Sequence, residues 1–327
     1  MSATEGAWSQ VASPTRRQLL GRILGLGAAG LLSGCRPAAE EPSDSKSNSE
    51  DTMKLSLSAR VAESFSSKER ADLTLDQIIG LAQEHGYEAI CMRASQVGTH
   101  SPPERVRAAA RSIAQAGLTV SMVTGDFAVP RNDEQGPKGL RNITPYLDLT
   151  EALGSDLIRI CMKKEEDIEW AARASDEARE RGIRLAHQAH CASLFETVQG
   201  ALDTLKRVGR SNFGIIYEPA NWFIAGEDYG AETIRRLEPW IMNVYVQNHL
   251  LTPTGVTVVE TWGRGGVAVD HIGLWEEGGV DFEEVFRGLD AIGYGGYVTV
   301  HQAFAGVMPV EEAAARSARY LKPLMGL

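Results

Sequence analysis

Residues 183–217 read IRLAHQAHCASLFETVQGALDTLKRVGRSNFGIIY, and this stretch decides the fold. Two short apolar runs, 183–190 and 213–217, flank a segment in which apolar residues recur at helical spacing: Phe195, Val198, Leu202, Leu205 and Val208. A one-sided apolar stripe of this period predicts an amphipathic helix, and the glycine that follows it is a helix stop signal. The stretch is therefore predicted to form a strand, a helix and a second strand, which is the unit of a parallel sheet.

The same unit repeats along most of the chain. Strands are expected at 54–58, 88–92, 118–123, 156–161, 183–190, 213–217, 242–246 and 297–300. Helical patterns lie between them, at 75–85, 103–116, 143–153, 165–181, 195–208 and 309–321. Eight such units within residues 53–327 predict a (β/α)8 TIM barrel. An open doubly wound sheet is the alternative, but the sequence contains no GxGxxG phosphate turn. Residues 250–279 interrupt the rhythm and are expected to be a long functional loop.

Composition excludes several classes of protein. The chain has 327 residues, of which 43% are hydrophobic, and a net charge of −10. This balance is typical of a globular protein, and the acidity argues against a nucleic-acid-binding protein. After Cys35 only three cysteines remain and no CxxC motif occurs, which argues against a disulfide framework or a zinc–thiolate site.

The first 52 residues have the features of an export signal and a tether. TRRQLL at 15–20 precedes an apolar run at 23–32, and LSGC follows at 32–35. This order resembles a twin-arginine signal that ends in a lipoprotein cleavage box, with Cys35 as the lipidated residue. Residues 36–52 are rich in proline, serine and acidic side chains and are expected to be a flexible linker. The sequence thus predicts export to the periplasm or cell envelope, with a lipid anchor as the only contact with the membrane.

Polar residues gather at the carboxyl ends of the predicted strands, where a TIM barrel has its active site. They are Arg93, Gln188, His190, Glu218, Asn221, Tyr245, Gln247, His249 and His301. Because side chains alternate along a strand, Gln188 and His190 are expected to face the barrel mouth and His187 to pack against helices. Apart from Lys163-Lys164, no basic cluster that could hold a phosphate stands out.

Two kinds of chemistry remain open for these residues. Gln188, Glu218 and His301 could hold a divalent metal ion with mixed oxygen and nitrogen ligands. His190, Glu218 and His301 could instead perform acid–base catalysis without a metal, since an imidazole titrates near neutral pH.

Four strings carry a resemblance to a known family. They are GIRLAHQAH at 182–190, FGIIYEPANWFIAGED at 213–228, IMNVYVQN at 241–248 and GGVDFEEVFRGLDAIGYGGYVTVH at 278–301. In order and spacing they resemble the xylose isomerase-like TIM barrels, also called sugar phosphate isomerases/epimerases. The resemblance implies a metal site at Gln188, Glu218, Tyr245 and His301, where the family usually has Glu, Asp, His and Glu. Only Glu218 keeps the type of ligand.

The resemblance implies an exported isomerase or epimerase, or a lyase, that acts on a sugar or polyol derivative by metal-assisted proton transfer. The nitrogen-rich ligand set would favour Zn, Mn or Fe over Mg. Side chains expected to contact the substrate are Arg93, Asn221, Tyr245, Gln247, His249 and Trp262. The alternative is a barrel that has lost catalysis and binds carbohydrate through aromatic residues such as Trp222, Trp262 and Trp275.

Overall fold

The computed structural model describes residues 52–63 and 67–327. The predicted export signal, 1–35, lies outside the described residues, as does the predicted linker, 36–52, except for Thr52. Within the described ranges, no helix combines the length and the hydropathy needed to cross a membrane.

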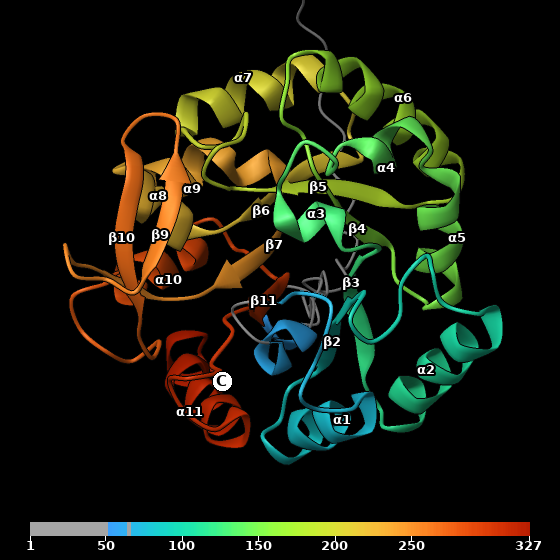
Figure 1. Ribbon diagram of the computed structural model, residues 1–327, viewed down its shortest axis with the longest axis horizontal. Helices are drawn as coiled ribbons and strands as arrows, with labels where there is room; N and C mark the ends of the chain where they lie inside the picture. Colours follow the sequence, from blue (N-terminus) through green and yellow to red (C-terminus); the bar gives the residue numbers. More distant parts are fainter. Residues whose placement is uncertain (1–51, 64–66) are drawn as a thin grey trace, which may run out of the picture. The chain divides into compact units, whose positions relative to one another are not determined.

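Eight parallel strands form a closed barrel (Figure 1). They are β1 (Lys54–Ser58), β2 (Ala89–Arg93), β3 (Thr119–Thr124), β4 (Leu157–Ile160), β5 (Arg184–Gln188), β6 (Phe213–Tyr217), β7 (Ile241–Val246) and β11 (Tyr297–Val300). Closure occurs at β1, which pairs in parallel with both β2 and β11. Each strand overlaps a predicted one, so the predicted (β/α)8 barrel is confirmed.

Helices surround this barrel, as Figure 1 shows. They are α1 (Leu75–Glu84), α2 (Pro103–Gln115), α3 (Ala128–Arg131), α4 (Lys138–Arg141), α5 (Thr144–Ala152), α6 (Glu166–Glu180), α7 (Val198–Val208), α8 (Pro219–Ala225), α9 (Ala231–Leu237), α10 (Phe282–Ala291) and α11 (Val310–Leu324). Two 3-10 helices, η1 (Ala59–Ala62) and η2 (Glu238–Trp240), are also present. Helix α7 begins where the Thr197 side chain caps Gly200 N–H, and it ends at Gly209, whose φ of 60° suits a residue without Cβ.

Strand alternation separates two cores. Side chains that point outward pack against the helices, and His187 is one of them: it is buried and its ring stacks on Phe195, with ring centroids 4.3 Å apart. The predicted orientation of His187 is therefore confirmed. The inward-pointing residues form a smaller cluster inside the barrel: Cys91, Met122, Leu157, Ala186, Ile216 and Tyr245. Toward the carboxyl ends of the strands, beyond this apolar cluster, the inward-pointing side chains are polar, and the candidate functional site lies there.

The segment 250–279 differs from its prediction as a loop. It contributes to a three-stranded antiparallel sheet of β8 (His249–Leu251), β9 (Thr257–Thr261) and β10 (Gly265–His271). Alternation is present in β9, where Val259 is more buried than Val258, but the flanking glycines and threonines obscure it. The sheet lies beside the barrel mouth in Figure 1 and contributes one wall of the cavity there.

Candidate functional site

A cavity of about 520 Å³ opens at the carboxyl ends of the barrel strands. Side chains predicted from the sequence line it: Arg93, Gln188, His190, Asn221, Gln247, His249 and His301. They come from strands or loops of five different βα units, so folding brings together residues that are up to 208 positions apart. The remaining lining residues include the β9 segment 257–260.

Three predicted site residues lie outside the lining of this cavity. Glu218 is 0% exposed and sits behind two glutamine side chains. Tyr245, also 0% exposed, lies under the ring of His301 at a centroid distance of 3.7 Å. Trp262 follows β9 and is 58% exposed, with the Lys163 ammonium 5.9 Å from its ring centroid.

Glu218 is positioned by the end of β6 and the start of α8. One of its oxygens accepts a hydrogen bond from Gln188 Nε2 and the other from Gln247 Nε2. Burial raises the pKa of the Glu218 carboxyl to about 8, although the nearby Arg159 opposes the shift. The carboxyl group therefore orients two amides that do face the cavity, and Gln188 Oε1 is left buried without a hydrogen-bond partner among the described residues.

His301 reaches the cavity from the end of β11. Its Nδ1 lies 3.1 Å from Ser58 Oγ, and no contact of Nε2 with the described part of the chain uses up that nitrogen. Burial lowers the pKa of His301 well below its usual value, and the charges of Arg93 and Arg159 act in the same direction. The imidazole is therefore neutral at neutral pH, with one ring nitrogen oriented by Ser58 and stacked in place by Tyr245.

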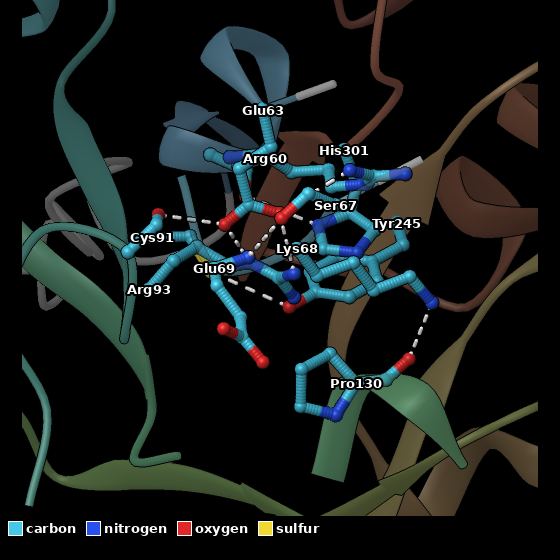
Figure 2. Close-up of polar contacts among 12 residues, drawn as sticks. Arg60, Glu63, Ser67, Lys68, Glu69, Cys91, Arg93, Pro130, Tyr245 and His301 are labelled. Atoms are coloured by element: carbon cyan, nitrogen blue, oxygen red, sulfur yellow. Dashed lines mark hydrogen bonds and ion pairs between the residues drawn. The ribbon is translucent and has the colours of Figure 1, made fainter. Parts of the chain in front are cut away.

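A buried ion-pair network that sequence reasoning missed lies beside His301 (Figure 2). Arg93 donates to Glu63 through two nitrogens, Nε to Oε1 at 3.0 Å and Nη2 to Oε2 at 2.7 Å. Ser95 Oγ and Arg60 Nη1 donate to the same carboxylate at 2.7 and 3.2 Å. Burial tends to raise the pKa of Glu63, but the charges and hydrogen bonds of Arg93, Arg60 and Ser95 together lower the pKa below its usual value.

Six of the described residues that line the cavity are basic, and four of them, Arg60, Lys68, Arg131 and Arg159, went unrecognised in the sequence. Its basic residues are Arg60, Lys68, Arg93, Arg131, Arg159 and Lys163, while Glu260 is the one acidic side chain among the described lining residues. The basic cluster thus extends far beyond Lys163-Lys164. One sequence signal could have revealed it: Arg159 interrupts the apolar strand DLIRIC two residues after Leu157, whose side chain belongs to the cluster inside the barrel.

The predicted metal ligands do not form a convincing divalent-cation site. Across residues 52–63 and 67–327, no three His, Cys, Asp or Glu side chains converge in a way that could hold a metal ion. Both Glu218 oxygens already accept amide hydrogen bonds, and Gln188 presents its amide nitrogen to that carboxylate. The charges of Arg93 and Arg159 act on His301 and would repel a divalent cation. The donor set therefore does not fit such an ion.

Two further histidines at the mouth are held neutral. His249 and His271 meet edge to face with ring centroids 4.6 Å apart. Burial lowers their pKa values to about 3 and about 4. His190 Nδ1 lies 2.8 Å from the carbonyl oxygen of Cys191, and burial lowers its pKa well below the usual value. These rings therefore add polar, uncharged edges to a cavity whose charge comes from arginine and lysine.

Comparison with known proteins gives a family match and several matches of fold. A family model described as xylose isomerase-like TIM barrel matches residues 79–324. No curated protein matches the sequence.

Among solved structures, a xylose isomerase domain protein from Planctomyces limnophilus is 17% identical with a TM-score of 0.62, and the match covers 84% of this chain and 96% of that one. The IOLI protein with a bound zinc atom is 17% identical with a TM-score of 0.61, covering 84% and 98%. D-psicose 3-epimerase in the presence of D-fructose is 13% identical with a TM-score of 0.61, covering 84% and 100%. At these identities the likeness concerns the fold.

Proposed function

Because the chain belongs to the xylose isomerase-like TIM barrel family, we propose that it is an enzyme that transfers a proton on a sugar or polyol derivative, as an isomerase or epimerase. The similarity to D-psicose 3-epimerase supports a polyhydroxylated substrate. A lyase would begin with the same removal of a proton from carbon. The cavity supports this proposal because it presents amides and imidazoles, which can hydrogen-bond hydroxyl groups.

One observation carries the proposal: a neutral His301 imidazole faces the cavity and is surrounded by guanidinium groups. A neutral imidazole can accept a proton, and Ser58 and Tyr245 fix its orientation. Fixed positive charge near the base stabilises the oxyanion that forms when a proton leaves the carbon next to a carbonyl group. His301 is therefore the proposed base, and the guanidinium groups supply the oxyanion stabilisation.

The other predicted catalytic residues take different parts in this proposal. Glu218 is a positioning residue, since it is covered by Gln188 and Gln247 and holds both side chains in place through its two oxygens. His190 lines the cavity and is a second candidate for proton transfer. The proposed reaction does not depend on the predicted Zn, Mn or Fe ion, because buried arginines replace the positive charge that a metal would supply.

The experiment measures proton exchange directly. Candidate ketoses, aldoses and sugar acids are incubated with the protein in deuterium oxide, and NMR follows exchange of the proton next to the carbonyl or carboxyl group. His301→Gln should abolish exchange on an accepted substrate while changing its Kd little. His85→Gln, at the end of α1 and away from the cavity, is the control and should behave as the natural chain. Equal loss of binding and exchange in His301→Gln would contradict the role of base.

The alternative of a carbohydrate-binding barrel without catalysis has less support. Stacking on sugar rings requires accessible aromatic faces, but Trp222 is 0% exposed and donates its indole N–H to the Phe195 carbonyl. Trp262 is accessible, although it lies outside the cavity lining. Exchange of a substrate proton catalysed by the natural chain would exclude this alternative.

We also propose that the protein is exported and anchored through Cys35, on the strength of the sequence pattern alone. Cys35→Ser should move the protein from the membrane fraction to the soluble fraction of the expressing cell. Replacement of Arg16 and Arg17 by lysine should block export. An unchanged distribution in both variants would contradict the proposal.

A further inference from the structure

The cations around the cavity differ in how much of their charge is already neutralised. Arg93 and Arg60 share the Glu63 carboxylate. Arg131 pairs with Glu69. These three guanidinium groups therefore have carboxylate partners within the protein.

The two lysines are also engaged. Lys163 Nζ donates to the Asn132 carbonyl at 2.8 Å and also to the Ala192 carbonyl. Lys68 Nζ donates to the Pro130 carbonyl at 2.5 Å, a contact drawn in Figure 2. Burial lowers the pKa of Lys68 to about 7, and the neighbouring arginines add to this shift. The lysine ammonium groups thus use part of their donor capacity on backbone oxygens.

Arg159 stands apart from all of these. It lies on the inward face of β4, lines the cavity, and is only 4% exposed. In the part of the chain that the structure describes, no hydrogen bond or ion pair of its guanidinium is found, and its Nε is fully buried without a partner. The N–H groups of Nη1 and Nη2 and one full charge are therefore available to a ligand in the cavity.

An unpaired charge in this position is costly, because burial removes water without supplying a counter-ion. Burial lowers the pKa of Arg159, and Arg93 acts in the same direction. Yet a guanidinium remains protonated in proteins even when buried. A ligand with a negative charge would remove this cost and would make hydrogen bonds to donors that have none.

We propose that Arg159 binds the carboxylate of a sugar acid, so that the substrate class of the enzyme is polyhydroxylated monocarboxylates. A planar carboxylate matches the guanidinium fork with two parallel hydrogen bonds. One uncommitted guanidinium balances one negative charge, which favours a carboxylate over a phosphate ester. Gln247 lines the same cavity, and its amide is suited to a hydroxyl group of such a substrate.

This inference deepens the proposed function and rests on it for the reaction, but it is tested by binding. The probes are D-gluconate, D-glucuronate and D-galacturonate, with D-glucose as the neutral analogue and D-glucose 6-phosphate as the phosphate ester. Calorimetry on the full-length purified protein should give at least one sugar acid a Kd lower than that of glucose by about tenfold or more, the usual worth of a charged hydrogen bond. If no acid binds better than glucose, or if the phosphate ester binds best, the proposal is wrong.

Variants of Arg159 connect the preference to this residue. Arg159→Met removes the charge but keeps an unbranched side chain in place of the arginine methylene groups, and loss of an unpaired buried charge should leave the fold intact or raise its Tm. This variant should lose the preference for the acid and retain the Kd for glucose. Arg159→Lys keeps the charge without the fork and should retain part of the preference. A preference that survives in Arg159→Met would overturn the assignment.

Two controls separate this inference from the proposed function. Arg210→Met changes an arginine that pairs with Asp176 outside the cavity, and it should leave all Kd values unchanged. His301→Gln should still bind the acid although proton exchange is lost. Binding of the acid with no exchange by the natural chain would contradict the proposed function alone, whereas exchange on neutral sugars without preference for acids would contradict the Arg159 subsite alone.

Discussion

Replacement of Glu63 by glutamine tests how strongly the buried ion-pair network holds the barrel mouth together. The Glu63 and Arg93 side chains are 0% and 1% exposed and make two hydrogen bonds of 3.0 and 2.7 Å. Glutamine keeps the size of the side chain but removes the charge and places an NH2 group opposite an arginine donor. Arg93 would then be a buried positive charge without its carboxylate partner.

Removal of one partner from a buried ion pair costs about 3–5 kcal/mol, because the remaining charge has lost both water and counter-ion. A loss of this size is a large part of the 5–15 kcal/mol that typically separates folded from unfolded states. The free energy of unfolding is measured by urea titration at pH 7, with linear extrapolation to water. Glu63→Gln should reduce it by roughly the amount expected for a buried pair.

The chain contains a matched control at its surface. Glu232 and Arg235 have nearly the same bidentate geometry, with hydrogen bonds of 2.9 and 2.7 Å, but both side chains are more than 60% exposed. Water screens this pair, so Glu232→Gln should change the free energy of unfolding little. The two substitutions therefore differ mainly in burial. If Glu63→Gln lost no more stability than Glu232→Gln, the reasoning about buried charge would be refuted.

Three other predictions follow from the same structure. Burial lowers the pKa of His187 to about 3. As the pH falls below 6.5, the His187 imidazole is therefore protonated in the unfolded chain but not in the folded one. The free energy of unfolding then decreases by about 1.4 kcal/mol per pH unit. Between pH 7 and pH 5, urea titration should therefore show a loss that is about 2 kcal/mol smaller in His187→Phe than in the natural chain, and equal losses would contradict the shifted pKa. Gln188→Glu would place a second buried carboxyl group beside Glu218 and should lower the Tm. Addition of ZnCl2 should recover part of this loss in the variant but leave the Tm of the natural chain unchanged. An equal gain in Tm in both proteins would indicate that the natural chain also binds the metal ion. Tyr245→Phe keeps the ring under His301 and should leave kcat within a factor of about three, since only a weak contact with the Cys91 thiol is lost. Tyr245→Ala removes the ring and should lower kcat with little change in KM. An unaffected kcat in Tyr245→Ala would show that the ring does not position His301.

The barrel could be predicted because local physical chemistry repeats in every unit. Apolar runs such as 213–217 form strands that are buried on both faces, and the apolar stripe in 198–208 forms a helix with one face to bury. When such strands and helices alternate along a chain, only a few architectures can bury all of these surfaces. The sheet of β8, β9 and β10 escaped prediction for a physical reason. Its strands face solvent on one side and contain glycine and threonine, so their period is weak.

Site residues could be predicted from the sequence where the residue type and its position after a strand were sufficient. Those whose role depends on contacts between distant parts of the chain were missed. Histidines and amides after strands were recognised because barrels place such positions at the mouth. The ion pair between Glu63 and Arg93 joins η1 to β2, and no spacing in the sequence indicates that these elements meet. The role of Arg159 depends on the lack of an ion-pair partner among the described residues, and only the three-dimensional structure can show this.

The arginines give a common explanation for several substitutions that looked unrelated in the sequence. The positions that the resemblance associates with metal ligands hold Gln188, Glu218, Tyr245 and His301, a set with a single carboxyl group. Burial raises the pKa of that carboxyl to about 8. Anionic ligands would be needed around a divalent cation, but around permanently charged guanidinium groups they would compete with an anionic substrate. Neutral amides, a phenol and a neutral imidazole avoid that competition. The neutral groups at these positions and the unpaired charge of Arg159 therefore have one explanation, in which fixed protein charge supplies the positive field of the site.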